Sequence, residues 1–302
     1  MKKIIKVNKI DDNLRLDKWL KLQYSALQQS YVEKNLRKKN ILVNNQKKQS
    51  SYRVVIGDEI KILNYNKEVY KNKILVKISK TIPKKLKEYF ISAIIYENKD
   101  FILLNKWAGI STQGGSKIKY SVDDLIKDIS PSYNLVHRLD KETSGLLIIA
   151  KNLNFTKLFG SLFKNQEIEK KYIGICQGSP QNLQSNIDLE ISDTKKKNLK
   201  QKTQTYYKVL NTQNHISQIL FYPKTGKKHQ IRIVCKNLGC PIIGDLKYNN
   251  QSKFKNEKLK LHAFNLRFTI MNKKYNFYSD LPDHFNEFFK INKLKNIKLN
   301  KF

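Results

Sequence analysis

The chain has 302 residues, and its 59 Lys and Arg against 25 Asp and Glu give a formal net charge of +34. This length predicts two domains, and so large a charge predicts a polyanionic partner, either nucleic acid or an anionic membrane surface. Apolar runs such as residues 145–150 are far shorter than the roughly 20 residues of a membrane-spanning helix. The sequence therefore favours nucleic acid and no membrane, with a solvated lysine-rich surface as the alternative.

The cysteines and the first residues of the chain indicate a compartment. Cys176, Cys235 and Cys240 are the three cysteines, and the spacing of the last two matches neither a zinc-binding nor a redox motif. We therefore expect free thiols and no bound metal. Residues 1–6 are charged but contain no apolar stretch of the kind that a secretory signal needs. A reducing, cytoplasmic location is expected.

The first predicted domain is a small α/β unit over residues 12–75 that begins with two amphipathic helices. In the first helix, Leu16, Trp19 and Leu20 fall on one face. The second helix opens with Ser30 and has Glu33 three residues later, which is the pattern of a capping box. Short strands are expected at residues 41–43, 52–56 and 59–62, with turns at 44–45 and 57–58.

A basic edge follows at the end of the second helix, where Arg37, Lys38 and Lys39 are consecutive. Such an edge neutralises RNA phosphates without reading the base sequence, so we predict that these residues bind RNA. The alternative is an ordinary helix pair with solvated cations. A Lys- and Asn-rich linker is expected next, over residues 76–90.

The second predicted domain, residues 91–302, is α+β with a mixed, largely antiparallel sheet. Its clearest helix follows Asn154, because Phe155, Leu158 and Phe159 recur at helical spacing and Leu162 continues the same stripe. That stripe is predicted to be core. Strand patterns rich in β-branched and aromatic residues occur at 91–96, 101–104, 145–150, 171–176, 206–210, 216–222 and 266–270.

A polar nonapeptide, residues 137–145, lies between the strand-like residues 133–136 and the strand predicted at 145–150. A segment held at both ends can fix a catalytic group while leaving it open to a substrate. Within it, Arg138 and Lys141 flank Asp140, and such cations keep a carboxylate ionised, able to attack a carbon or to stabilise positive charge. The alternative is that Asp140 and Arg138 form a structural ion pair.

The nonapeptide carries a family resemblance. His137-Arg138-Leu139-Asp140, followed by Thr-Ser-Gly-Leu-Leu, resembles the signature of the RluA family of pseudouridine synthases, in particular its RluC and RluD branch. Residues 15–60 resemble the S4 domain, a small RNA-binding module that this branch carries at its N-terminus. Further segments similar to those of the family are residues 103–109, 113–116, 170–172, 223–232, 239–245 and 261–263.

The resemblance implies an isomerase that converts uridine to pseudouridine in structured RNA, with 23S ribosomal RNA expected, and that needs no cofactor or metal. Asp140 would be the catalytic carboxylate, acting on ribose C1′ or on the uracil ring. Tyr172 would stack on the extruded base, and Arg232 would pair with Asp140. Arg138 would bind the RNA where the uridine leaves the stack. We also expect a monomer.

Three positions depart from the family pattern: Trp107, Lys227 and Val234. They leave the proposed catalytic residues intact but bear on the choice of substrate. His229 and His262 are predicted to be packed and hydrogen-bonded. Residues 225–228 lack the first glycine and the final Ser or Thr of a phosphate-binding loop, which argues against nucleotide hydrolysis. The remaining alternative is a noncatalytic RNA-binding protein, which would be favoured if the catalytic residues did not share one cavity.

Overall fold

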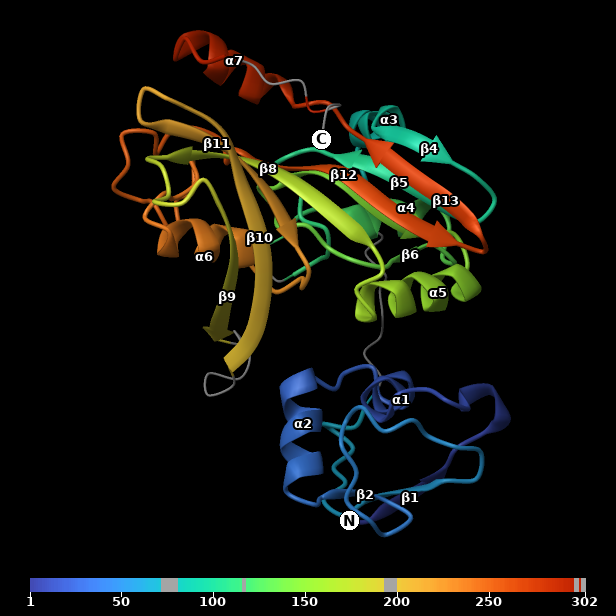
Figure 1. Cartoon of the computed structure of the whole chain (residues 1–302). Coiled ribbons are helices and arrows are strands. Elements are labelled where there is room, and N and C mark those ends of the chain that lie inside the picture. Colours follow the sequence, from blue (N-terminus) through green and yellow to red (C-terminus); the bar gives the residue numbers. More distant parts are fainter. Residues whose placement is uncertain (72–80, 116–117, 193–199, 296–298, 300–302) are drawn as a thin grey trace. The chain divides into compact units, whose positions relative to one another are not determined.

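The computed structural model describes residues 1–71, 81–115, 118–192, 200–295 and 299. The chain divides into two compact units, Met1–Thr81 and Ile82–Phe302 (Figure 1). Residues 75–80, which end the first predicted domain and begin the expected linker, lie outside the described residues, as does Ser116 of the segment 113–116. Each unit has its own hydrophobic core and is described separately.

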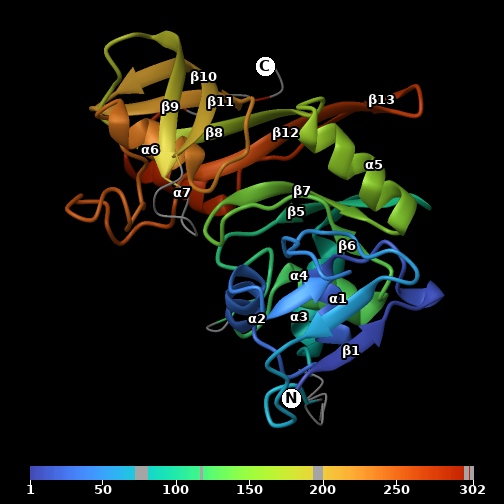
Figure 2. The ribbon, with the colours of Figure 1, turned by 90° about the horizontal axis from the view of Figure 1, so that it is seen from below.

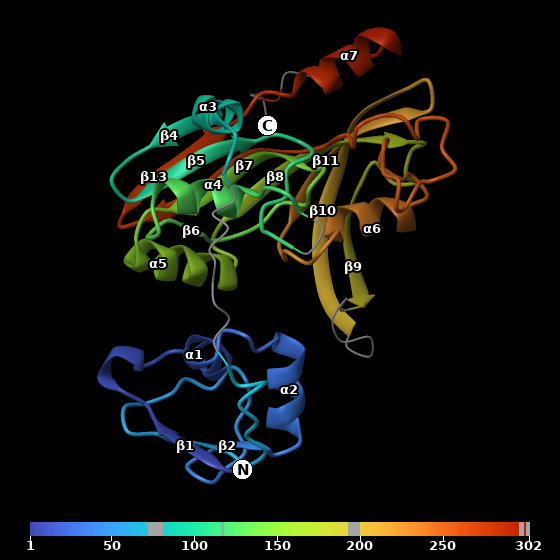
Figure 3. The ribbon, with the colours of Figure 1, turned by 180° about the vertical axis from the view of Figure 1, so that it is seen from behind.

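The N-terminal unit is a three-stranded antiparallel sheet packed against two helices (Figure 3). The strand order is β1-β3-β2, so β3 hydrogen-bonds to both of its neighbours. Trp19 and Leu20 are buried together with Val32, Leu36 and Ile60, which confirms the apolar face predicted for the first helix. The elements are β1 (Lys3–Lys6), the 3-10 helix η1 (Lys9–Asp11), α1 (Leu16–Gln23), α2 (Gln29–Arg37), β2 (Ile41–Val43) and β3 (Glu59–Ile62).

Helix α2 starts earlier than the sequence predicted. Its N-cap residue is Gln28 rather than Ser30, and the Gln28 side chain makes no capping hydrogen bond. The carboxylate of Glu33 instead accepts a hydrogen bond from the side chain of Gln29, at 3.2 Å. The predicted capping box is therefore wrong, because Ser30 lies inside the first helical turn.

The strand predicted at residues 52–56 is also wrong. Their backbone pairs with the chain that precedes α1: the N–H of Val54 donates to the C=O of Leu14 at 2.9 Å, and only an isolated bridge, between Arg15 and Arg53, is formed there. Strand β1, which the sequence analysis did not predict, pairs with β3 instead.

The second unit is built on a ten-stranded sheet in the order β4-β5-β7-β12-β8-β11-β10-β9, with β13 beside β12 and β6 beside β7 (Figure 1). Strand β12 pairs in parallel with β7 and antiparallel with β8 and β13. This confirms the predicted mixed, largely antiparallel α+β fold. The strands are β4 (Ile94–Glu97), β5 (Phe101–Lys106), β6 (Asn134–Leu135), β7 (Ser144–Ala150), β8 (Glu169–Gln177), β9 (Gln184–Ser192), β10 (Lys200–Gln213), β11 (Ile216–Pro223), β12 (Leu261–Ile270) and β13 (Lys273–Tyr278).

Helices cover both faces of the sheet around β7, whose residues are all buried (Figure 2). Leu146 and Ile148 pack in one core cluster with Phe159 of α5 (Leu153–Lys164). Leu147 and Ile149 pack on the other face with residues of α3 (Lys84–Ser92) and α4 (Val122–Ile129). Strand β7, which begins with the last two residues of the nonapeptide, is therefore packed between helices on both faces of the sheet. The remaining helices are α6 (Gln230–Asn237) and α7 (Asp283–Ile291).

Two helix boundaries correct the sequence predictions. Helix α5 has Asn152 as its N-cap, whose side chain accepts from the N–H of Phe155 at 2.9 Å, so the helix begins before the expected Asn154. Helix α3 occupies residues that were assigned to the linker. The lysines of this segment made it resemble a linker in the sequence, but its residue Phe90 is buried in the core of the second unit.

Candidate active site

The loop that carries Asp140 joins β6 to β7 and is fixed on both sides of that residue. Before it, Leu139 is buried, and its backbone N–H and C=O hydrogen-bond to Oγ1 of Thr112 at 3.1 and 2.6 Å. After it, the C=O of Lys141 accepts from the N–H of Gly109 at 2.9 Å. The Asp140 side chain remains 18% exposed. The loop thus presents an accessible carboxylate on a firmly held backbone.

Lys106, at the end of β5, also fixes this loop by hydrogen bonds. Its buried Nζ donates to the backbone C=O groups of Trp107, Ile110 and Lys141 at 3.0, 3.1 and 3.2 Å, so all three ammonium donors have acceptors. Burial lowers the pKa of Lys106 to about 7. Trp107, a departure from the family pattern, packs edge-on against Tyr89 of α3, with the ring centroids 4.6 Å apart. The sequence analysis gave Lys106 no role, although it lies within the segment 103–109.

The glycine of the nonapeptide meets a packing requirement. Gly145 has φ +113°, and a Cβ there would lie 2.2 Å from the backbone oxygen of Ala263, where β7 and β12 pair in parallel. Next to it, Oγ of Ser144 hydrogen-bonds to Nδ1 of His262 at 2.8 Å, and Nε2 of His262 lies 2.9 Å from Oγ of Ser279. His262 is therefore a buried structural residue, as predicted.

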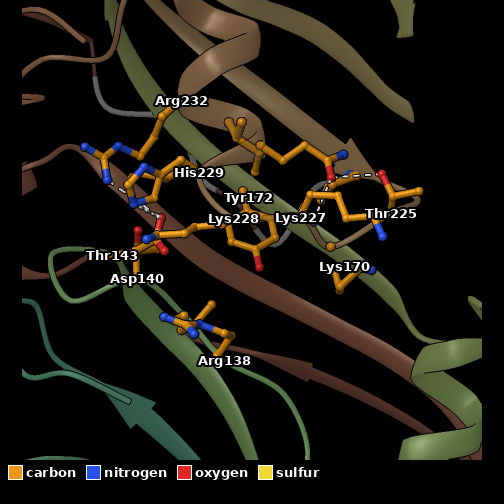
Figure 4. A pocket seen from close by; sticks show the side chains of 16 residues that line it. Arg138, Asp140, Thr143, Lys170, Tyr172, Thr225, Lys227, Lys228, His229 and Arg232 are labelled. Atoms are coloured by element: carbon orange, nitrogen blue, oxygen red, sulfur yellow. Dashed lines mark hydrogen bonds and ion pairs between the residues drawn. The ribbon is translucent and has the colours of Figure 1, made fainter. Parts of the chain in front are cut away.

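One cavity brings the three predicted catalytic residues together. Asp140, Tyr172 and Arg232 line it, although they come from the β6–β7 loop, from β8 and from α6 (Figure 4). Arg138 lies on its rim and is exposed. Among the described residues that line this cavity, Asp140 is the one carboxylate. The condition that favoured a noncatalytic protein, catalytic residues that do not share a cavity, is not met.

Arg232 has a different principal partner from the one predicted. Its Nε and Nη2 donate to the two carboxylate oxygens of Asp245 at 2.7 and 2.6 Å, whereas its Nη1 lies 3.7 Å from Oδ2 of Asp140. The Asp245 side chain is fully buried and also accepts from the backbone N–H groups of Lys247 and Tyr248, both at 3.1 Å. The predicted pairing of Arg232 with Asp140 is therefore present only as a longer ion pair, because a fixed, buried carboxylate holds the guanidinium fork.

His229 contacts the carboxylate, although the sequence analysis did not assign it to the site. It has a left-handed backbone, φ +57°, directly before α6, and its Nε2 lies 3.8 Å from Oδ2 of Asp140. Its Nδ1 hydrogen-bonds to the hydroxyl of Tyr248 at 3.0 Å, as expected of a packed histidine. Burial lowers the pKa of His229 despite the nearby carboxylate. Its position within the family-like segment 223–232 was the available signal.

Tyr172 forms the aromatic wall of the cavity. It packs against two core clusters of the second unit and is half-buried. Burial, and then the charge of Asp140, raise the pKa of the Tyr172 phenol. The residue therefore offers a flat face and a protonated hydroxyl at neutral pH, which suits contact with a nucleobase.

Cations surround the single carboxylate. Lys170 of β8 lines the cavity and is half-buried, and burial lowers its pKa. Lys227 and Lys228 line the cavity from the loop before α6 and are exposed. Val234, another departure from the family pattern, is instead buried within α6 and does not line the cavity. A cavity lined by these cations attracts an anionic ligand.

The other predicted RNA-binding residues belong to the N-terminal unit. Arg37 ends α2, and Lys38 and Lys39 follow it, all three exposed.

The three cysteines are buried and free, with Sγ of Cys176 3.9 Å from Sγ of Cys235. Within the described ranges, no group of three His, Cys, Asp or Glu side chains is arranged to hold a metal ion, and no helix is long and apolar enough to cross a bilayer.

Comparison with known proteins identifies the family. The profile of RNA pseudouridylate synthases matches residues 100–237. The chain is 39% identical over 291 residues to the ribosomal large subunit pseudouridine synthase C of Rickettsia bellii, over 90% of this chain and 96% of that protein. It is 40% identical over 299 residues to the protein of the same name from Rickettsia prowazekii, over 93% and 98% of the two chains. The solved structure of human RNA pseudouridylate synthase domain containing 4, at 24% identity, covers 71% of this chain and 98% of its own with a TM-score of 0.63, so it shares the fold. The chain therefore belongs to the RNA pseudouridylate synthase family.

Proposed function

We propose that this protein isomerises uridine to pseudouridine in the ribosomal RNA of the large subunit, with Asp140 as the catalytic carboxylate. The observation that carries this proposal is the single carboxylate of Asp140 in a cavity whose described lining also includes five Lys and Arg side chains and the aromatic ring of Tyr172. The 23S RNA substrate is supported by the names of the Rickettsia relatives, which this chain matches over nearly their whole length.

The reaction is a net isomerisation. The bond from C1′ to N1 breaks, the uracil ring turns and a bond from C1′ to C5 forms; C5 loses its proton to the solvent, and N1 takes up a proton from the solvent. An ionised Asp140 serves equally for attack on C1′ or on the uracil ring. Arg232 and His229, at 3.7 and 3.8 Å from Oδ2 of Asp140, hold that oxygen in place without a close hydrogen bond that would compete with the substrate.

The target base must leave the RNA stack to reach Asp140. Extrusion costs a few kcal/mol, and stacking on an aromatic side chain returns about 1–3 kcal/mol per base. Tyr172 supplies this face inside the cavity. Arg138 lines the cavity and is exposed, and we propose that it occupies the gap that the uridine leaves in the RNA.

The N-terminal unit is proposed to act as an S4-like RNA-binding domain. In this proposal the unit Met1–Thr81, which includes β1, forms the module, and the unit Ile82–Phe302, which includes α3, forms the catalytic domain. Arg37, Lys38 and Lys39 would contact RNA phosphates, since they are exposed at the end of α2. We further propose that the protein works as a monomer in the cytoplasm.

Release of tritium tests the proposed activity directly. Purified protein is mixed with an unmodified 23S RNA transcript labelled with tritium at C5 of uridine, and carbodiimide mapping then locates each pseudouridine. We expect release by the wild type and none by Asp140→Asn, with equal RNA binding by both. Binding without release by the wild type would favour a noncatalytic RNA-binding protein. Release by Asp140→Asn would show that Asp140 is not the catalytic carboxylate.

A further inference from the structure

A second cavity lies next to the proposed catalytic one and has no part in the mechanism above. It is bounded by the end of α5, by His137 and by the loop that follows β11. The two cavities share part of their lining, which consists of Arg138, Lys170, Tyr172, Thr225, Gly226 and Lys227. These residues lie at the partition between them. In Figure 4 Lys170 lies on the side of the first cavity that is away from Arg232.

His137 gives the second cavity a neutral aromatic wall with one hydrogen-bond donor. Its ring stacks on Phe163 with centroids 4.5 Å apart, and its Nε2 accepts from the backbone N–H of Ile148 at 2.8 Å. Burial lowers the pKa of His137 to about 3, so the ring is neutral near pH 7. Because Nε2 is the acceptor, the ring proton is on Nδ1. The arrangement resembles a surface for a base more than a site for a charge.

The rim of the same cavity is cationic. Lys164, the last residue of α5, is exposed, as are Lys224 and Lys227 on the loop after β11. Lys170, which also lines the cavity, is half-buried. None of the described residues that line this cavity is acidic. An aromatic wall with a neutral donor beside a group of cations matches the two parts of a nucleotide, its base and its phosphate.

We propose that the second cavity binds the nucleotide adjacent to the target uridine in the RNA strand. This inference rests on the proposed function, since it takes the first cavity as the site of the extruded uridine. Adjacent nucleotides share a phosphate, and the two cavities share Arg138 and Lys170, so this phosphate would lie at the partition. The neighbouring base would contact His137 and Phe163. The second cavity would thus hold the RNA strand beside its target.

A pair of charge reversals on one helix tests the rim. Lys164→Glu changes a residue of the cavity, and Lys157→Glu makes the same change at an exposed position of α5 that does not line it. With the tritium-labelled 23S transcript, we expect Lys164→Glu to raise the RNA concentration for half-maximal rate at least tenfold, with a saturating rate within twofold of the wild type. Lys157→Glu should raise that concentration less than threefold. Equal effects of the two variants would overturn the proposal, whereas a wild type that releases no tritium would refute the proposed function instead.

Crosslinking tests the position of the neighbouring base. RNA hairpins around a mapped target uridine carry 4-thiouridine at the position before the target in one hairpin and at the position after it in the other. One of the two should crosslink to the peptide that contains Phe163 and Lys164, and the crosslink should weaken in Lys164→Glu. If neither flanking position reaches that peptide while the RNA is still converted, the neighbouring nucleotide lies elsewhere and the inference is wrong.

Discussion

Replacing Asp245 by Asn should destabilise the second unit, because this carboxylate holds Arg232. The Asp245 side chain is 0% exposed and accepts from Nε and Nη2 of Arg232 and from the backbone N–H groups of Lys247 and Tyr248. An amide has one acceptor oxygen in place of two, and its NH2 group would face the guanidinium. Removing one member of a buried ion pair costs about 3–5 kcal/mol. We expect the free energy of unfolding to fall by that amount.

The same variant should slow the reaction at least tenfold in a single turnover. In the native site the fork of Arg232 is bound to Asp245, and only Nη1 approaches Asp140, at 3.7 Å. Once residue 245 is neutral, the guanidinium is free to form a bidentate pair with Asp140, which would withdraw this carboxylate from the substrate. A tenfold loss corresponds to about 1.4 kcal/mol in the activation free energy.

Urea unfolding and single-turnover tritium release measure the two effects, and Glu169→Gln is the matched control. Glu169 is the acidic partner of Arg267, but their side chains are 62% and 60% exposed and 3.9 Å apart. An exposed pair of this kind contributes about 0–1 kcal/mol, so the control should unfold and react almost as the wild type does. Equally mild results for Asp245→Asn and Glu169→Gln would refute the idea that Asp245 positions Arg232.

Three further outcomes are expected. Asp140→Asn should keep the melting temperature and RNA affinity of the wild type while abolishing tritium release, and a native-like rate would contradict its role. A chain that lacks residues 1–81 should fold and keep its rate at saturating RNA. In filter binding it should bind RNA more weakly, and its affinity should depend less steeply on salt concentration. An unchanged slope of affinity against salt would argue against RNA binding by the N-terminal unit. Burial lowers the pKa of His262 from 6.5 to about 3, so between these values the unfolded chain binds a proton that the folded chain does not. Its contribution to stability is present above pH 6.5 and is lost as the pH falls, by about 2 kcal/mol between pH 7 and pH 5, and urea unfolding of His262→Gln should lack this part of the pH dependence.

The strands nearest the site were predictable because their sequence pattern matches their burial. Residues 145–150 are continuously apolar, and β7 is buried on both faces by α5 on one side and by α3 and α4 on the other. The polar nonapeptide before β7 was the expected place for a catalytic side chain, and Asp140 does line the cavity. Local pattern sufficed here because burial of the strand and exposure of the loop both follow from residues close in sequence.

Helix α6 shows where local pattern fails. Its sequence contains Ile231, Ile233 and Val234, whose β-branched side chains favour a strand by composition. The helix is stabilised by packing instead, because Ile231, Val234 and Cys235 lie at helical spacing and Cys235 is buried beside Cys176 of β8. The left-handed conformation of His229, which turns the chain into the helix, has no local sequence signal either, since it is not a glycine.

The choice of partner by Arg232 could not be read from the sequence, because two acidic residues in family-like segments were available to it. Physical chemistry separates them once their surroundings are known. Asp245 is fully buried and fixed by two backbone N–H groups, so a bidentate arginine completes its hydrogen bonding. Asp140 must contact the target nucleotide in the proposed reaction, and a tight bidentate pair with Arg232 would occupy both of its carboxylate oxygens. A guanidinium anchored to Asp245, with Nη1 3.7 Å from Asp140, stabilises the charge of that carboxylate and leaves it free to react. The proposed function therefore requires the arrangement that the structure has, with Arg232 bound to the structural carboxylate and only near the catalytic one.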